Sequence, residues 1–69
     1  MEVSVERLQE LRRRRVMSIS DLSEVSGVHR NTIHRIERGN PAYTTTIRKL
    51  ARALDVDPAE LVGPDRRGG

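Results

Sequence analysis

The spacing of its aliphatic residues is the feature that most constrains how this chain can fold. The aliphatic residues recur at intervals of three or four positions, and glycines interrupt the pattern. Such intervals place side chains on one face of an α-helix, so the pattern predicts helices and no strands. The four apolar stripes comprise Val5, Leu8 and Leu11; Leu22 and Val25; Ile33 and Ile36; and Ile47, Leu50, Ala51 and Leu54. Gly27 and Gly39 follow the second and third stripes, where a left-handed residue commonly ends a helix. The sequence therefore predicts an all-α fold.

Local start signals mark further helix boundaries. Ser18 with Asp21 three residues later resembles a capping box, which predicts a helix start there. Asn40 and Pro41 predict a loop, and a threonine among residues 44–46 is expected to cap the next helix. A short fifth helix is expected at residues 58–61, with Asp57 as its cap. Residues 1–63 then form one domain, and residues 64–69 are expected to be a disordered tail.

The size and residue types exclude several classes of protein. A chain of 69 residues suffices for one small domain. Cysteine is absent, which excludes disulfides and thiolate metal sites. Tyr43 is the only aromatic residue, which argues against modules that stack single-stranded bases on aromatic side chains. Since no apolar run approaches the roughly 20 residues needed to cross a bilayer, we expect a soluble cytoplasmic protein without membrane contact.

The charge is unevenly distributed along the chain. Thirteen Lys and Arg against ten Asp and Glu give a net charge of +3. A basic run covers residues 12–15, residues 29–38 carry three Arg against one Glu, and the last part of the chain is acidic. The basic segments are therefore suited to bind polyanions, whereas the acidic last part of the chain would repel them. The basic run has three interpretations: a nuclear-localisation-like patch, a phosphate contact, or a solvated helix end that favours cations.

Residues 30–38 are expected to form a helix with two chemically different faces. On a helical wheel Ile33 and Ile36 share a narrow apolar stripe, and the polar side chains lie almost opposite. These polar side chains are Arg30, Asn31, His34, Arg35 and Arg38. Arg forks to N7 and O6 of guanine and Asn pairs with adenine, each contributing about 1–3 kcal/mol of discrimination in a DNA duplex. The alternative is a solvated face that binds nothing.

The stretch from Ile19 to Arg38 resembles the helix-turn-helix of the Xre/Cro/C1 family, the phage-repressor-like DNA-binding domains. The resemblance rests on Leu22, Ser23, Gly27, Val28, Ile33 and Ile36, which match the family pattern of apolar, small and turn residues. It extends over roughly residues 5–62, through segments 11–12, 36–39 and 48–54. The resemblance implies a compact five-helix bundle, similar to lambda repressor, whose second motif helix enters the major groove.

Site residues follow from this resemblance by position. It implies base reading by Arg30, Asn31 and Arg35, with His34 as a weaker candidate. It implies phosphate contacts by Ser18, Ser20, Arg38, Asn40 and Thr44. Ile19 stands where the family often has Gln, which removes one phosphate contact, and Ser23 replaces the usual Ala. His29 replaces a capping Ser or Thr, so a less firm start of the recognition helix is expected.

The resemblance also implies a largely buried ion pair between Arg12 and Glu37. Glu37 lies beside Ile33 on the helical wheel, toward the core side, and its negative charge would repel a phosphate. If the pair is structural, removing the carboxylate leaves an unpaired buried guanidinium, and Glu37→Ala is expected to cost about 3–5 kcal/mol.

Several other residues have both a structural and a functional interpretation. His29 and His34 lie about 140° apart on a helix, and no Cys or suitable acid completes a metal site. No ordered catalytic motif contains the Ser, His and Asp residues, so neither catalysis nor a cofactor is expected. Tyr43 has two open roles, packing on the fourth helix or binding a phosphate. The apolar residues at the end, Val56, Leu61 and Val62, either close the core or form a dimer patch.

The predicted function is sequence-specific binding of double-stranded DNA by a small transcriptional regulator. One helix reads only a few base pairs, so a homodimer on a palindromic operator is expected. No small-molecule ligand is expected. The alternative is a protein-interaction module, such as an antitoxin-like subunit or a transcription adaptor.

Overall fold

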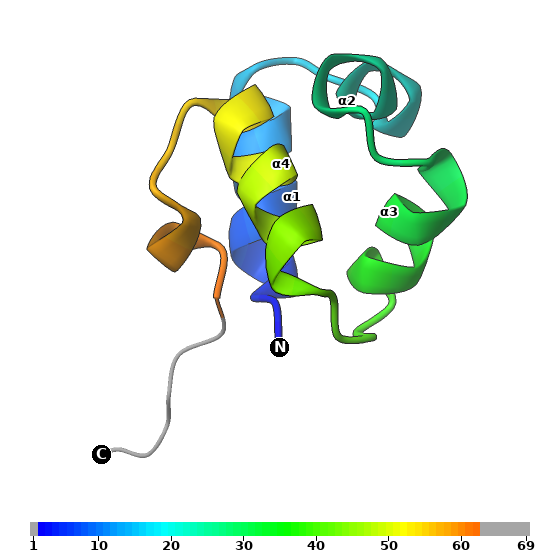
Figure 1. Cartoon of the computed structure of the whole chain (residues 1–69). Helices are drawn as coiled ribbons and strands as arrows, with labels where there is room; N and C mark the ends of the chain where they lie inside the picture. The colour runs from blue at the N-terminus through cyan, green and yellow to red at the C-terminus, as the bar shows by residue number, and fades with distance from the viewer. Residues whose placement is uncertain (1, 63–69) are drawn as a thin grey trace.

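The computed structural model describes residues 2–62, which form four α-helices and one turn of 3-10 helix (Figure 1). These elements are α1 (Val5–Arg14), α2 (Ile19–Ser26), α3 (Arg30–Glu37), α4 (Thr44–Leu54) and the 3-10 turn η1 (Pro58–Glu60). No strand forms within residues 2–62, although Val3 and Val62 make one isolated antiparallel bridge. The all-α class is confirmed.

The expected fifth helix is a single 3-10 turn, so the bundle has four α-helices within the described residues. Asp57 caps η1 as predicted, since its carboxylate accepts a hydrogen bond of 2.9 Å from the backbone N–H of Ala59. Leu61 is completely buried and anchors the end of the turn, and its N–H donates to the carbonyl of Pro58 three residues earlier, the hydrogen bond of a 3-10 turn. Too few residues then separate α4 from this anchor to form a regular helix. The tail predicted for residues 64–69 lies outside the described residues.

The core is built from one face of each helix. Helix α2 packs against α3 and α4, α1 packs against α3, and η1 packs against α4. The buried apolar residues are Leu8, Leu11, Leu22, Val28, Ile33, Ile36, Ala42, Ile47, Leu50, Ala51, Leu54 and Leu61. The third and fourth apolar stripes are therefore confirmed as core. The second stripe is narrower than predicted, because Val25 is 59% exposed.

Two of the predicted helix boundaries are confirmed in detail. Ser18 begins α2 with a capping box: its hydroxyl accepts from the N–H of Asp21, and the Asp21 carboxylate accepts from the N–H of Ser18, each at 3.0 Å. Gly27 ends α2 in the left-handed region, with φ of 79° and its N–H donating to the carbonyl of Ser23. A β-branched or larger residue would be strained at that φ, so glycine suits the turn.

The start of α4 differs from the prediction that a threonine caps it. Helix α4 begins at Thr44, its N-cap is Tyr43, and no side chain forms a cap hydrogen bond. Ala42 precedes this cap and Ile47 is the fourth helical residue, and both are buried. These are the positions of a hydrophobic staple, so packing of the apolar pair sets the first turn instead of a hydroxyl cap.

Candidate nucleic-acid interface

Helices α2 and α3 form a helix-turn-helix joined by residues 27–29. After the left-handed Gly27, the N–H of Val28 donates to the hydroxyl of Ser26 at 3.1 Å, and the Val28 side chain is buried. Val28 and Ile33 occupy the staple positions at the start of α3 and belong to the same core cluster. The direction in which α3 leaves the turn is therefore determined by core packing and by the positive φ of Gly27.

His29 caps α3 in place of the Ser or Thr that the family usually has. Its backbone is extended, with φ of −60° and ψ of 143°, as an N-cap requires. The imidazole Nδ1 accepts a hydrogen bond of 3.1 Å from the backbone N–H of Asn31. A ring nitrogen thus serves as the acceptor that a Ser or Thr hydroxyl usually provides.

The polar face of α3 is open to solvent. Ile33 and Ile36 are 0% and 1% exposed, whereas the four candidate base-reading residues are all exposed. These four are Arg30, Asn31, His34 and Arg35. The structure therefore places them on α3 outside the core, as base reading requires, with the isoleucines holding the helix against the core.

The candidate phosphate contacts lie at helix ends. Ser18 and Ser20 are exposed in the first turn of α2, but the Ser18 hydroxyl and the nearby carboxylate of Asp21 are joined in the capping box. Arg38 is the exposed C-cap of α3, and Thr44 is exposed at the start of α4. Each position is accessible to a DNA backbone, and the capping box occupies one hydroxyl lone pair of Ser18.

Asn40 has a structural contact that the sequence did not predict. Its side-chain amide donates to the carbonyl of Arg35 at 2.9 Å, and its backbone N–H donates to the same carbonyl at 3.1 Å. Gly39, with φ of 104°, donates to the carbonyl of Ile36 at 2.9 Å. Asn40 therefore caps the C-terminal end of α3, whether or not it also contacts a phosphate.

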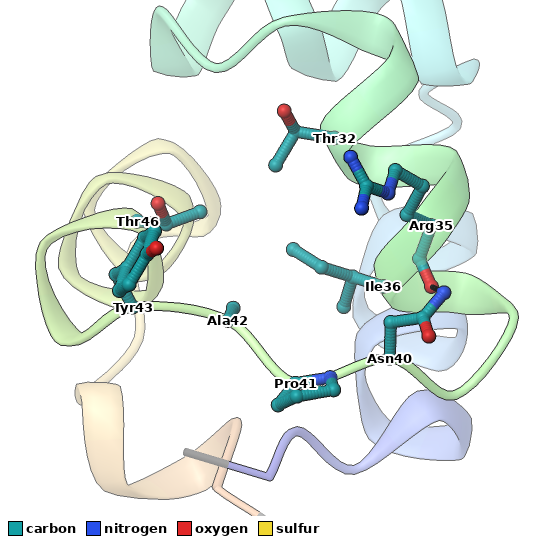
Figure 2. A pocket seen from close by; sticks show the side chains of 8 residues that line it. All are labelled: Thr32, Arg35, Ile36, Asn40, Pro41, Ala42, Tyr43 and Thr46. Atoms are coloured by element: carbon teal, nitrogen blue, oxygen red, sulfur yellow. Dashed lines mark hydrogen bonds between the residues drawn. The ribbon is translucent and has the colours of Figure 1, made fainter.

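A groove of about 490 Å³ separates α3 from the start of α4. Figure 2 shows Thr32 and Arg35 on the α3 side, Tyr43 and Thr46 on the α4 side, and Ile36 between them. Sequence reasoning did not identify Thr32 or Thr46. The only local signal was the position of Thr32 three residues before Arg35, which makes the two neighbours on one helix face.

Tyr43 lies at the mouth of this groove and is 83% exposed. Of the two roles left open for Tyr43, packing into the fold is not favoured by that exposure. Leu61 closes the core, and the half-buried Val56 packs against the same core cluster. Val62 is half-buried and forms the isolated bridge with Val3.

Arg12 and Glu37 link α1 to the end of α3. The Arg12 Nε and Nη2 atoms donate to the two carboxylate oxygens at 3.0 and 3.3 Å, and Nη1 donates to the carbonyl of Met17 at 3.0 Å. Gln9 adds a hydrogen bond of 3.4 Å to the same carboxylate. The side chains are 17% and 9% exposed, so the pair is mostly buried and is engaged within the fold.

The rest of the basic run is spread over the end of α1. Arg13 and Arg14 are exposed, and Arg14 pairs with Glu10 at 3.5 Å. Arg15 donates from Nε to the carbonyl of Leu54 at 2.9 Å, which links the ends of α1 and α4. Arg15 therefore neutralises a helix C-terminus, while the role of Arg13 stays open.

Residues 2–62 contain neither a membrane-spanning helix nor a metal-binding cluster. No helix there combines the length and apolar character needed to cross a membrane. No group of three or more His, Asp or Glu side chains in that range is arranged to hold a metal ion.

The comparisons with known proteins agree with this geometry. Residues 7–65 match the model of the Cro/C1-type HTH DNA-binding domain. The crystal structure of the restriction-modification controller protein C.AhdI from Aeromonas hydrophila is 38% identical, with a TM-score of 0.76 over 81% of this chain and 86% of that one. The chain therefore belongs to the Cro/C1-type HTH DNA-binding domain family. The expected function, a DNA-binding transcriptional regulator, is confirmed at that level.

Two other structures are similar in fold alone. They are PhpD with cadmium complexed with hydroethylphosphonate and native PhpD with cadmium atoms, each 19% identical with a TM-score of 0.81. Each alignment covers 100% of this chain but 15% of the other. A search of curated protein sequences returned no match.

Proposed function

We propose that this chain binds a short palindromic DNA operator as a homodimer, with α3 of each copy in the major groove. The observation that carries the proposal is the division of α3 into a buried isoleucine face and an exposed face with Arg30, Asn31 and Arg35. Arg30 and Arg35 would fork to guanines and Asn31 to an adenine, with His34 as a secondary contact. The proposal includes binding without catalysis and a location in the cytoplasm.

Affinity in this proposal comes mainly from the DNA backbone. Arg38 is a basic residue at the exposed end of α3. Thr44 begins α4, and the first turn of that helix lies across the groove from Arg35 through Thr46. Ser18, Ser20 and Asn40 would add neutral hydrogen bonds. Because such contacts release counterions, binding should weaken linearly with the logarithm of salt concentration.

The dimer is proposed from the size of the reading surface. One helix contacts only a few base pairs, and a two-fold dimer doubles this length with half-sites about one helical turn apart. In the described part of the chain Val56 and Val62 are half-buried apolar side chains after α4, and the proposed pairing uses the surface that they leave exposed.

The testing experiment is selection from a pool of duplexes with a random centre, at near-physiological salt, followed by sequencing. Enrichment of an inverted repeat is expected. Affinity for the selected duplex is then measured for two base-reading variants, Arg30→Ala and Asn31→Ala. The control is Arg52→Ala, which removes a charge in the last turn of α4, away from the groove. Each base-reading variant should lose discrimination worth about 1–3 kcal/mol, and Arg52→Ala should retain it.

Three outcomes would count against the proposal. Retention without sequence enrichment would leave a non-specific DNA binder, and no retention would favour the protein-interaction module. A monomeric mass at micromolar concentration, both alone and with the selected duplex, would contradict the dimer.

A further inference from the structure

The cap of the recognition helix is made by the imidazole of His29, a side chain whose ring nitrogens accept or donate hydrogen bonds according to their protonation. The imidazole Nδ1 of His29 accepts from the backbone N–H of Asn31 at 3.1 Å, so Nδ1 carries no proton and the neutral ring holds its proton on Nε2. Imidazole is the side chain whose ordinary titration falls between pH 5 and 8. A Ser, Thr, Asn or Asp cap would remain an acceptor throughout that range.

Few charged groups compete for this ring. Within residues 2–62 no carboxylate lies within 4.0 Å of the His29 imidazole. On α2, which packs against α3, the carboxylate of Asp21 is held in the capping box and Glu24 is exposed. On α3 itself the charged or titratable side chains are Arg30, His34, Arg35 and Glu37, and Glu37 is paired with Arg12. On α1, which also packs against α3, the charged groups with ion-pair partners are Arg7, Glu10, Arg12 and Arg14, and Glu6 and Arg13 are exposed.

We propose that His29 is a positioning residue for DNA reading: its neutral imidazole holds the first turn of α3, and protonation releases that turn. The inference rests on the proposed function of α3. Asn31 supplies both the N–H that the imidazole binds and the side chain proposed to read adenine. Loss of the cap therefore acts directly on Asn31 and on its neighbour Arg30.

The direction of the pH effect follows from two changes at the same atom. Protonation makes Nδ1 a donor, which removes the acceptor for the N–H of Asn31. It also places a positive charge at the positive end of the helix dipole. The cap is therefore present at high pH and lost as pH falls, and recognition of the operator should become less selective in acid.

Raw affinity is a poor measure of this effect, because a protonated imidazole also attracts phosphates of any sequence. The ratio of affinities for the selected operator and a scrambled duplex of equal length removes most of that contribution. An N-cap typically changes an equilibrium constant by about fivefold. We therefore expect the ratio for the wild-type chain to fall by about threefold to fivefold between about pH 7.5 and pH 5.5.

His29→Asn is the matched variant, since Asn is a strong N-cap that does not titrate in this range. For His29→Asn, the ratio of affinities for the operator and the scrambled duplex should equal the wild-type ratio at the higher pH. It should keep that value at the lower pH. His29→Ala should show the reduced ratio at both. His34 is present in both the wild-type chain and His29→Asn, so its contribution cancels in their comparison. Equal pH profiles for these two proteins would overturn the inference.

A measurement without DNA separates this inference from the proposed function. In nuclear magnetic resonance spectra of the chain alone, the amide signal of Asn31 should shift with the same midpoint as the His29 ring nitrogens. At the higher pH, Nδ1 should show the chemical shift of an unprotonated nitrogen. An Asn31 amide that ignores the ring titration would overturn the positioning role even if the operator is bound. Absence of selective binding by the wild-type chain at the higher pH would instead overturn the proposed function, and the inference with it.

Discussion

Replacing Glu37 by alanine tests how α3 is held in position for DNA. Glu37 accepts two hydrogen bonds from the guanidinium of Arg12, at 3.0 and 3.3 Å, and one from Gln9 at 3.4 Å. Arg12 also donates to the carbonyl of Met17, immediately before α2. The pair therefore joins α1, the entry to α2 and the end of α3, and its loss should loosen all three.

The expected cost can be estimated from the geometry. Removing one partner of a fully buried pair costs about 3–5 kcal/mol, but Arg12 is 17% exposed and keeps its bond to Met17. Each hydrogen bond to a charged group contributes about 1.5–3 kcal/mol, and the variant loses two from Arg12. We expect Glu37→Ala to cost about 2–4 kcal/mol. Since small proteins have roughly 0.05–0.15 kcal/mol of stability per residue, this is a large part of the total.

Urea unfolding followed by far-ultraviolet circular dichroism measures this cost. The midpoint should fall while the slope stays the same, because the surface exposed on unfolding hardly changes. Glu10→Ala is the matched control: Glu10 is 49% exposed and pairs with Arg7 and Arg14 at 3.4 and 3.5 Å. Such exposed pairs contribute about 0–1 kcal/mol, so the control should unfold near the wild-type midpoint.

A Glu37→Ala midpoint equal to that of Glu10→Ala would refute the reasoning. A second test is the double variant Arg12→Leu with Glu37→Leu, which leaves no unpaired charge in the fold. It should recover much of the stability that either single replacement loses. Strictly additive losses would show that the two side chains act independently.

Three further predictions concern the turns and the DNA backbone. Gly27→Ala should lower the free energy of unfolding by about 1–2 kcal/mol, because φ is 79° and an L side chain is strained there. An added Cβ would meet nothing within 4 Å, so the backbone conformation is the whole cause. An unchanged urea midpoint would contradict this. Val16→Gly should stabilise by roughly 0.5–1 kcal/mol, because Val16 is 88% exposed with φ of 53° at the end of α1, and a lower midpoint would count against it. Arg38→Ala should reduce the salt dependence of duplex binding by about one unit of slope, measured by anisotropy titration at several salt concentrations; an unchanged slope would remove Arg38 from the backbone contacts.

The helix-turn-helix could be predicted because its signals are local. The capping box of Ser18 and Asp21, the left-handed Gly27 and the spacing of Ile33 and Ile36 each act within a few residues. Such signals depend on backbone conformation and helical periodicity, which hold in any tertiary context. The exposed face of α3 follows from the same periodicity.

The remaining features required contacts that local patterns do not contain. Tyr43 replaced the expected threonine cap because Ala42 and Ile47 pack into the core together. The groove between α3 and α4 depends on how a loop returns the chain beside Arg35. The cap by His29 depends on the orientation of its ring, which a capping-residue preference does not predict.

The sequence by itself thus determined the helical class, the turn at Gly27 and the polar face that α3 presents, since each follows from the conformational preferences of neighbouring residues. Only the tertiary structure determined that α4 begins at Thr44 and that the fifth helix is a single 3-10 turn. It also determined that His29 and Asn40 cap the two ends of α3. Buried apolar side chains from distant parts of the chain must share one core, and that packing outweighs the weaker preferences of single residues at helix ends.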